Sequence, residues 1–336
     1  MIRLSICIST LNRAELLAET LESIAPQITD EVELLILDGA STDNTQEIIA
    51  AFAARCPRLR SVRLDKGEGF DEKYCRLAEL AAGEYCWMFA DDDLLKPGAV
   101  AAVLEATRKD YSLIVVNAEV RSKDLAVCLQ PRRINFQQDR TYSPTPSDFD
   151  HLLADTAMYL TYIGAIVIKR MLWNQRERQK YFGTIFVHVA VIFQSPLPAD
   201  ALVMTHPWIV IRYGNALWTP RGFEVWMFTF PELVWSFTHF ADWAKQRVER
   251  REPWRCWHRL LMARAMGHYS GNEYSRWLER RFRSPLEKIF GRTVAAVPIA
   301  PLNFLARFLV KWILRKSPSI TLYDLERWRG SSASTP

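Results

Sequence analysis

Three adjacent carboxylates, Asp91, Asp92 and Asp93, come one residue after an apolar run at residues 85–89. We call these three residues the acidic cluster. The run is bounded by Gly83 and by the acids, a pattern that predicts a buried strand ending at the cluster. Neighbouring carboxylates repel one another unless a cation lies among them, and Mg²⁺ and Mn²⁺ prefer oxygen ligands. The pattern therefore predicts a cation site at a strand end or, as the simpler alternative, a solvated acidic turn.

Alternating strands and helices must position these acids. Apolar runs lie at residues 4–9, 32–37, 59–64 and 85–89. Helix-forming segments separate them, at residues 14–24, 45–55 and 71–82. This order predicts an α/β fold with a doubly wound, mostly parallel sheet and right-handed crossovers.

Polar side chains collect at three of the predicted strand ends. Thr10, Asn12 and Arg13 follow the first strand, Asp38 follows the second, and the acidic cluster follows the fourth. Because open α/β sheets bind ligands at the carboxyl ends of their strands, we expect these side chains to share one site. The chain contains neither GxGxxG nor GxxxxGK[ST], so a metal on a diphosphate is the expected means of holding a nucleotide.

The composition is that of a globular protein with an uneven distribution of charge. The chain has 336 residues, is 49% hydrophobic and carries a net charge of +5. Residues 240–330 contain 19 Lys or Arg against 8 Asp or Glu, so the positive charge is concentrated there. The six cysteines form no CxxC pair and the chain opens on an apolar strand pattern, so we expect free thiols, no signal peptide and a cytoplasmic location.

The basic region at residues 216–336 is also rich in tryptophan, and we expect it to be helical. Within it, residues 301–316 predict an amphipathic helix. Its polar stripe is Asn303, Arg307, Lys311 and Arg315, and its apolar side is Leu302, Leu305, Phe308, Leu309, Trp312 and Ile313. Such a helix suits the plane of an anionic membrane surface; the alternative is an ordinary helix packed on the domain. Its charges argue against a membrane span, and no nucleic-acid-binding module is recognisable.

Four stretches share the order and spacing of one family's motifs. They are residues 5–13 (SICISTLNR), 37–43 (LDGASTD), 82–85 (AGEY) and the acidic cluster followed by Leu-x-x-Pro. Residues 3–105 thereby resemble the nucleotide-binding half of family 2 glycosyltransferases, which have the GT-A fold. Stretches at residues 162–165, 182–188 and 211–216 resemble a narrower subgroup, the abequosyltransferase-like enzymes of O-antigen assembly.

The resemblance implies an organisation of the chain and a reaction. It implies a GT-A catalytic domain at residues 1–215, divided into a nucleotide-binding half at 1–110 and an acceptor half at 111–215, before a helical, membrane-associating extension at 216–336. The implied reaction moves a sugar, such as a dideoxyhexose, from a nucleotide diphosphate with inversion. The membrane-surface interpretation of the basic helix fits an acceptor glycan carried on a polyprenyl diphosphate, at the inner face of the cytoplasmic membrane.

The resemblance also implies roles for the residues at the strand ends. Thr10, Asn12, Arg13 and Asp38 would surround the base and ribose. Asp91 would contact the ribose, and Asp92 and Asp93 would hold Mn²⁺ or Mg²⁺ on the diphosphate. Ala90 stands where the family often has its first acid, so which two of the three acids hold the metal stays open.

Gly39 is a second departure from the family pattern, which commonly has two adjacent acids after the second strand. The second acid can accept a hydrogen bond from the ring N–H of uracil. Cytosine carries no proton on that nitrogen, so a glycine favours a CDP-linked donor. The alternative is that Gly39 only serves a tight turn.

A general base is the remaining requirement of an inverting transfer. The family supplies an acid in the region that corresponds to residues 183–194, which here contains His188 and no acid. His188 is therefore the candidate base, with a metal ligand or a buried core histidine as alternatives and Glu177 and Asp155 as further candidates.

Two residues before the fourth strand complete the set of candidates. Asp71 and Lys73 begin the third predicted helix, where the sugar and phosphates of a donor would reach. Lys73 would meet a phosphate as a point charge. The alternative for both residues is a solvated, charged helix start.

Two other functions fit the same pattern less well. A nucleotidyltransferase on a related sheet would usually open with a glycine-rich, basic phosphate loop, which is absent. A catalytically silent protein that binds sugar nucleotides or glycans would keep the site without turning over the donor. Use of a UDP- or dTDP-sugar on another acceptor is the alternative within the family.

Overall fold

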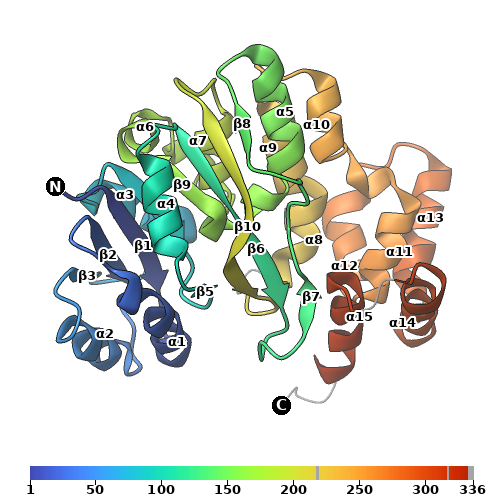
Figure 1. The fold of residues 1–336 in the computed structure, drawn as a ribbon. Coiled ribbons are helices and arrows are strands. Elements are labelled where there is room, and N and C mark those ends of the chain that lie inside the picture. Colours follow the sequence, from blue (N-terminus) through green and yellow to red (C-terminus); the bar gives the residue numbers. More distant parts are fainter. Residues whose placement is uncertain (217–218, 316–317, 332–336) are drawn as a thin grey trace. The chain divides into compact units, whose positions relative to one another are not determined.

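The computed structural model describes residues 1–216, 219–315 and 318–331, and Figure 1 shows their helices and strands. The chain forms two compact units. Unit 1 consists of Met1–Arg121, Pro131–Tyr213 and Phe237–Val248. Unit 2 consists of Ser122–Gln130, Gly214–Ser236 and Glu249–Pro336. The predicted functional division at residues 110 and 215 stays a prediction.

Unit 1 is built on a mixed sheet whose strands run in the order β3-β2-β1-β4-β9-β6-β10-β5. Its parallel part consists of β1 (Leu4–Thr10), β2 (Val32–Asp38), β3 (Leu59–Arg63) and β4 (Tyr85–Phe89). In the register of β1 and β2, Thr10 lies opposite Asp38, and β4 ends beside β1 with Phe89 opposite Ile8. The polar residues after these strands therefore meet at one edge, as the sequence predicted.

The second part of the sheet is partly antiparallel. Strand β9 (Ile166–Lys169) runs antiparallel to both β4 and β6 (Leu113–Arg121), and β10 (Ala201–Arg212) runs parallel to β6. The short β5 (Leu94–Leu95) pairs antiparallel with β10, and β8 (Arg140–Tyr142) joins β10 as well. Because β5 starts directly after the acidic cluster, its pairing brings the end of β10 to that cluster. The predicted α/β fold with a mostly parallel sheet is confirmed.

Helices connect and cover these strands. They are α1 (Ala14–Ile24), α2 (Thr45–Ala53), α3 (Phe70–Leu80), α4 (Ala99–Thr107), α5 (Pro146–Thr156), α6 (Arg170–Gln175), α7 (Val187–Phe193) and α10 (Asp242–Val248). Helix α3 packs on β1 and β2, and α4 packs on β6. The apolar run that contains His188 forms helix α7, and every residue of this helix is buried.

Unit 2 is mainly helical, as the sequence predicted for the C-terminal region. Its longer helices are α9 (Phe230–Ser236), α11 (Trp257–Ala265), α13 (Pro285–Ala296), α14 (Ile299–Phe308) with the π-helical turn η9 (Leu309–Ile313), and α15 (Ile320–Ser331). One apolar cluster contains Phe228, Trp254 and Tyr269, and a second contains Ala306 and Leu325. Unit 2 therefore has apolar cores of its own.

A buried polar network fixes the start of β4 against β1. The Ser5 hydroxyl donates to Glu33 Oε1 at 2.6 Å and accepts from the Gly83 N–H at 2.8 Å, while the Ala82 N–H donates to the same Glu33 oxygen at 2.5 Å. A Cβ atom on Gly83 would lie 2.6 Å from Ser5 Oγ and 2.7 Å from Ser5 N. Only a glycine therefore allows this close approach of the two backbones.

We predict that Gly83→Ala destabilises the protein by about 1–3 kcal/mol, because the added methyl group must push β1 away from a well-packed position. Urea unfolding followed by circular dichroism measures the change. Gly67→Ala is the matched control, since nothing lies within 4 Å of a Cβ there. We expect the control to stay within about 0.5 kcal/mol of the wild type. Equal stability of the two variants would contradict the prediction.

Candidate active site

Arg13, which follows β1, holds two members of the acidic cluster. Its Nη1 donates to Asp91 Oδ1 at 2.8 Å and its Nη2 donates to Asp92 Oδ2 at 2.7 Å. The three acids are buried, with only 4%, 9% and 2% of Asp91, Asp92 and Asp93 exposed. Burial acts to lower the pKa of Arg13, but the carboxylates act in the opposite direction and the net shift is upward. The guanidinium therefore stays charged and serves as a counter-ion for the cluster.

Asp93 is bound to a different part of the sheet. Its Oδ1 accepts a hydrogen bond of 2.7 Å from the backbone N–H of Arg212, the last residue of β10. Arg212 Nε donates to the Asp92 carbonyl oxygen at 3.0 Å, and the guanidinium also pairs with Glu19. Arg212 lies in the stretch at residues 211–216 that resembles the abequosyltransferase-like subgroup, but the sequence alone indicates no role for it. Only the pairing of β5 with β10 reveals the contact, because the two residues are 119 positions apart.

With all three acids ionised, the acidic cluster would carry more negative charge than Arg13 and Lys73 neutralise. Burial raises the pKa of Asp91 to about 6, although Arg13 opposes the shift. Burial and the adjacent Asp92 raise the pKa of Asp93 well above its usual value. A divalent cation would relieve this excess, and Asp92 keeps one carboxylate oxygen without a hydrogen bond in the described chain. The cluster therefore fits a metal that shares its ligands with a phosphate.

The protein alone does not enclose such a cation. Among the described residues, no group of three or more His, Cys, Asp or Glu side chains is placed to hold a metal ion. Mg²⁺ commonly takes one or two carboxylates and completes its shell with substrate phosphates and water. The arrangement thus suits a cation that arrives with a diphosphate.

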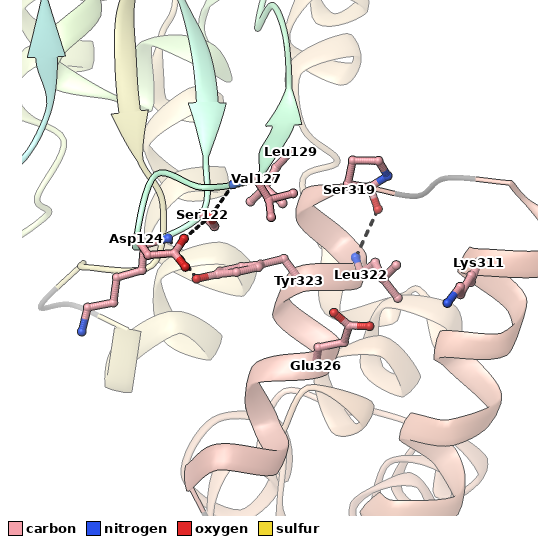
Figure 2. A pocket seen from close by; sticks show the side chains of 11 residues that line it. Ser122, Asp124, Val127, Leu129, Lys311, Ser319, Leu322, Tyr323 and Glu326 are labelled. Atoms are coloured by element: carbon pink, nitrogen blue, oxygen red, sulfur yellow. Dashed lines mark hydrogen bonds between the residues drawn. The ribbon is translucent and has the colours of Figure 1, made fainter.

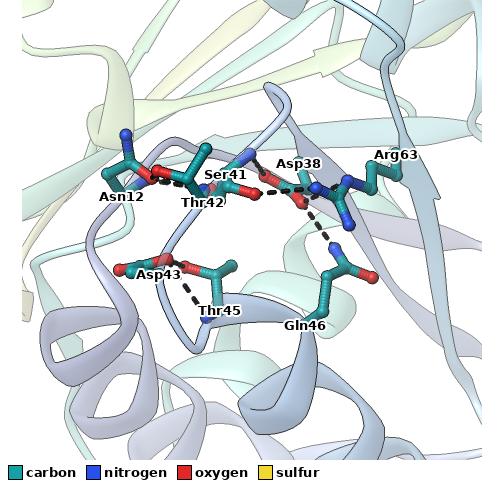
Figure 3. A network of polar contacts seen from close by, with 8 residues as sticks. All are labelled: Asn12, Asp38, Ser41, Thr42, Asp43, Thr45, Gln46 and Arg63. Carbon is teal, nitrogen blue, oxygen red and sulfur yellow. Dashed lines mark hydrogen bonds and ion pairs between the residues drawn. The ribbon is translucent and has the colours of Figure 1, made fainter.

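Asp38, at the end of β2, organises the loop that follows it (Figure 3). The Asp38 carboxylate is fully buried; its Oδ1 accepts from the Ser41 N–H at 2.9 Å and its Oδ2 from Gln46 Nε2 at 2.5 Å. Arg63 Nε lies 3.7 Å from Oδ2. Both oxygens thus have protein partners, Ser41 in the loop and Gln46 at the start of α2, and a direct contact of Asp38 with a donor stays a prediction.

Asn12 joins the loops after β1 and β2 (Figure 3). Its Oδ1 accepts from the Thr42 N–H at 2.7 Å, and its own N–H donates to the Ser41 hydroxyl at 2.9 Å. Its backbone is left-handed, with φ of 52°, a conformation that asparagine tolerates better than most residues. Thr10 is buried beside these loops, and its hydroxyl acts to lower the pKa of Asp91 without the full geometry of a hydrogen bond.

Lys73, on α3, extends toward the same strand ends. Burial lowers the pKa of its ammonium group, while Asp91 and Asp38 act to raise it. A Cβ on Gly39 would lie 3.6 Å from Lys73 Cδ and 3.3 Å from the Thr10 carbonyl oxygen. Within the described residues the ammonium forms no hydrogen bond or ion pair with protein. The structure therefore places Lys73 near Asp38 and Asp91 with its donors available to an anion.

Asp71 lies on the same helix but serves another contact. It is 1% exposed; its Oδ2 accepts from the Ile185 N–H at 2.9 Å and its Oδ1 from the Val187 N–H at 3.1 Å. Val187 is the first residue of α7, and Ile185 is left-handed with φ of 63°. Asp71 therefore caps α7 and holds the turn before it, and its predicted contact with the donor stays a prediction.

His188, the candidate base, is the second residue of α7 and is fully buried. Its Nε2 lies 3.4 Å from the Thr161 carbonyl oxygen, and Nδ1 has no partner in the described chain. Its ring lies near Phe70 and Phe186, with ring centroids 6.0 and 6.2 Å away. Burial lowers the pKa of His188 to about 4, so the imidazole is neutral at pH 7. Its role as a base stays a prediction that requires access for an acceptor.

The two further candidates for the base have local partners. Glu177 Oε1 accepts from the N–H groups of Arg178 and Gln179 at 2.8 and 2.9 Å. Asp155 Oδ2 accepts from Arg140 at 3.0 Å and from the Tyr142 hydroxyl at 2.8 Å. Each carboxylate thus stabilises its own segment.

Unit 2 contains a separate hollow of about 600 Å³ (Figure 2). Its lining includes Lys123, Asp124, Lys311, Tyr323 and Glu326, and the Tyr323 hydroxyl accepts from the Lys123 N–H at 3.1 Å. None of the residues predicted for the donor site lines it. The hollow is therefore distinct from the strand-end site in unit 1.

Known proteins resemble this chain in sequence and in fold. Residues 5–174 match the model of the family described as Glycosyl transferase family 2. Abequosyltransferase RfbV of Salmonella typhimurium is 27% identical over 234 residues, which cover 65% of this chain and 69% of that protein. Other curated relatives, chondroitin synthase of Escherichia coli and a PGL/p-HBAD biosynthesis glycosyltransferase of Mycobacterium bovis, are matched over 17% and 39% of their own lengths.

A solved structure supports the fold over nearly the whole chain. Residues 1–349 of S. aureus TarS give a TM-score of 0.61 at 13% identity, covering 98% of this chain and 92% of that one. The same TarS segment in complex with UDP-GlcNAc gives a TM-score of 0.55 at 15% identity over the same shares. At these identities the likeness concerns the fold alone.

We predict that His188 makes stability depend on pH. Its pKa is about 4 in the folded protein and 6.5 as the ordinary value, so the unfolded chain binds more protons between these limits. This contribution is complete above pH 6.5 and is lost as the pH falls toward 4. From pH 7.5 to pH 4.5 the wild type should lose about 2.5 kcal/mol more than His188→Gln in urea unfolding. Parallel losses in the two proteins would contradict the buried, neutral imidazole.

Proposed function

Because the chain belongs to glycosyl transferase family 2, we propose that it transfers a sugar from a nucleotide diphosphate donor to a glycan hydroxyl with inversion at the anomeric carbon. The observation that carries the proposal is the meeting of Arg13, Lys73 and the acidic cluster at the carboxyl ends of β1 and β4. These groups combine cations for phosphates with carboxylates for a metal. The likeness to abequosyltransferase RfbV supports a dideoxyhexose donor and a place in the synthesis of a surface polysaccharide such as O-antigen.

The site residues would act mainly by binding and by electrostatics. Lys73 would contact a phosphate, and Asp91 would accept from the ribose. Asp92 and Asp93 would hold Mn²⁺ or Mg²⁺, which when bound supplies positive charge opposite the leaving diphosphate. Arg13 pairs with Asp91 and Asp92 and holds both carboxylates in place before the donor arrives. The TarS complex with UDP-GlcNAc supports a nucleotide sugar as the ligand of this fold.

The acceptor side of the reaction requires a base. We assign His188 as the base that takes the acceptor hydroxyl proton, because a neutral imidazole can accept one. The acceptor would be a glycan on a polyprenyl diphosphate. Turnover of His188→Gln tests the assignment, since a variant with near-normal turnover would leave His188 as a core residue.

Gly39 supports a cytosine base in the donor. Its φ lies outside the left-handed region that only glycine adopts readily, so the turn itself does not require a glycine. The restriction at Gly39 is steric, because a Cβ atom there would lie 3.3 Å from the Thr10 carbonyl oxygen. An acid at this position would serve a uracil ring N–H, which cytosine lacks. We therefore favour a CDP-sugar over a UDP- or dTDP-sugar.

We predict that the protein releases nucleotide from a CDP-sugar at least about tenfold faster than from the matching UDP-sugar, because the uracil ring N–H would lack an acceptor beside Gly39. Gly39→Asp should move this preference toward the UDP-sugar. Gly39→Ala is the control, because it adds the same Cβ without the carboxylate. A clear UDP preference in the wild type would reject the cytosine assignment.

We predict that Asp92→Asn lowers metal-stimulated donor turnover about a hundredfold or more, since an amide cannot replace the charge of a carboxylate at the cation. The measurement is nucleotide release with Mn²⁺ or Mg²⁺ against the same reaction in chelator. Asp242→Asn, at an acid whose side chain is 82% exposed on α10, is the control and should keep wild-type turnover. A wild type that binds donor without releasing nucleotide would instead be the non-catalytic binding protein.

A further inference from the structure

The outer surface of α13 and of α14–η9 in unit 2 exposes large apolar side chains. On α13, Leu286, Ile289 and Phe290 are 78%, 62% and 39% exposed. Their spacing of three and four residues places them on one side of the helix. A soluble surface rarely keeps so much apolar area in one place without a partner.

The following helix continues this exposure. Phe304, Phe308 and Trp312 recur every four residues along α14–η9 and are 61%, 50% and 65% exposed. Leu305 and Ile313 lie beside them and are also exposed. We call the exposed apolar side chains of α13 and α14–η9 the apolar face.

The inner side of α14–η9 packs on the rest of unit 2 and includes a buried polar residue. Asn303 is 2% exposed, and its Nδ2 donates to the carbonyl oxygens of Ala265 and Leu325 at 3.0 and 2.8 Å. Ala306 and Val310 pack into the second apolar core of unit 2. The helix is therefore amphipathic as predicted, but it packs on the protein through the side that carries Asn303. The alternative expected from the sequence, a helix packed on the domain, holds for this side of the helix, and the apolar face lies on the other side.

The segment that carries the apolar face has an excess of positive charge, although Arg292 pairs with Glu279 and Arg307 pairs with Glu326. Residues 280–315 contain eight Lys or Arg and a single acid, Glu287. That acid is already engaged, because it pairs with Arg255 at 2.5 Å and caps α13 through Ser284. Lys311 and Arg315 flank the exposed Trp312. A surface of this kind is complementary to an anionic partner that also has an apolar interior.

The length and packing of the two helices decide how they would meet a bilayer. No single described helix is long and apolar enough to cross a membrane, whereas Pro285–Ala296 and Ile299–Ile313 reach that length and composition together, bent by 90°. Val294 and Ala306 on their inner sides are part of the apolar cores of unit 2. A span would have to give up this packing, so the helices fit the interfacial plane better than a crossing.

We propose that the apolar face docks unit 2 on an anionic lipid bilayer, with α13 and α14–η9 lying in the interface and their basic residues among the headgroups. The protein would then be peripheral, on the cytoplasmic side where nucleotide sugars are made. This inference goes beyond the proposed function, because it concerns lipid and needs neither donor nor acceptor. It also gives the transferase a location beside a lipid-linked acceptor.

Flotation of the full-length protein with vesicles tests the proposal. We expect binding to phosphatidylcholine vesicles that contain about one third phosphatidylglycerol, and much weaker binding to pure phosphatidylcholine. Phe308→Ser and Trp312→Ser should each weaken binding about tenfold, the effect of withdrawing one large side chain from the interface. Lys311→Glu should weaken binding only to the anionic vesicles. Trp243→Ser, at a tryptophan of α10 in unit 1 that is 47% exposed, is the matched control and should bind like the wild type.

Three outcomes would overturn the proposal. They are a wild type that does not float, Phe308→Ser and Trp312→Ser variants that float like the control, and a dimer that Trp312→Ser dissociates without changing flotation. The last outcome would assign the apolar face to a second copy of the chain. Because the substituted side chains are exposed, the variants should melt like the wild type and release nucleotide equally fast without vesicles. Lost flotation with unchanged nucleotide release separates this proposal from the proposed function.

Discussion

The buried ion pairs between Arg13 and the acidic cluster are the constraint on which the rest of unit 1 depends. Removing carboxylates from water is expensive unless cations and hydrogen bonds accompany them. Arg13 reaches Asp91 and Asp92 only if β1 and β4 end side by side, and their parallel register provides this. Gly83 in turn lets the start of β4 approach β1 closely enough to set that register. Arg13 stabilises the buried cluster in the absence of a ligand, but one guanidinium cannot neutralise three carboxylates. The remaining demand for positive charge favours the binding of a metal with a diphosphate.

The strand ends and their polar residues could be predicted because that information is local. Apolar runs of strand length, each followed by polar residues, determine which side chains gather at the carboxyl edge of a parallel sheet. Thr10, Asn12, Asp38 and the acidic cluster follow this rule. The sequence could not show that the side-chain oxygens of Asp38 and Asn12 accept hydrogen bonds from the segment between Ser41 and Gln46. Those partners are determined by how this segment folds.

Residues whose surroundings come from distant segments are less predictable from the sequence. His188 stands in an apolar run, and only the packing of α7 shows that its ring is fully enclosed. Arg212 touches the acidic cluster because β10 pairs with β5, a contact with no trace in either local sequence. Asn303 has the same limit, since the sequence shows an amphipathic helix without telling which side faces the protein. In each case the local pattern predicts the helix or strand, but it does not predict which residues pack against it.

The capping of α7 by Asp71 has a consequence for the recombination of such proteins. Asp71 belongs to the nucleotide-binding half that the sequence predicts, whereas the N–H groups of Ile185 and Val187 belong to the acceptor half. A chimaera could join the first half of one relative to the second half of another. It would then take the carboxylate that accepts these hydrogen bonds from one parent and the N–H groups that donate them from the other. Such a chimaera keeps its α7 cap only if the incoming α3 presents a carboxylate at the position of Asp71. The modularity of the two halves is therefore limited by a single side chain.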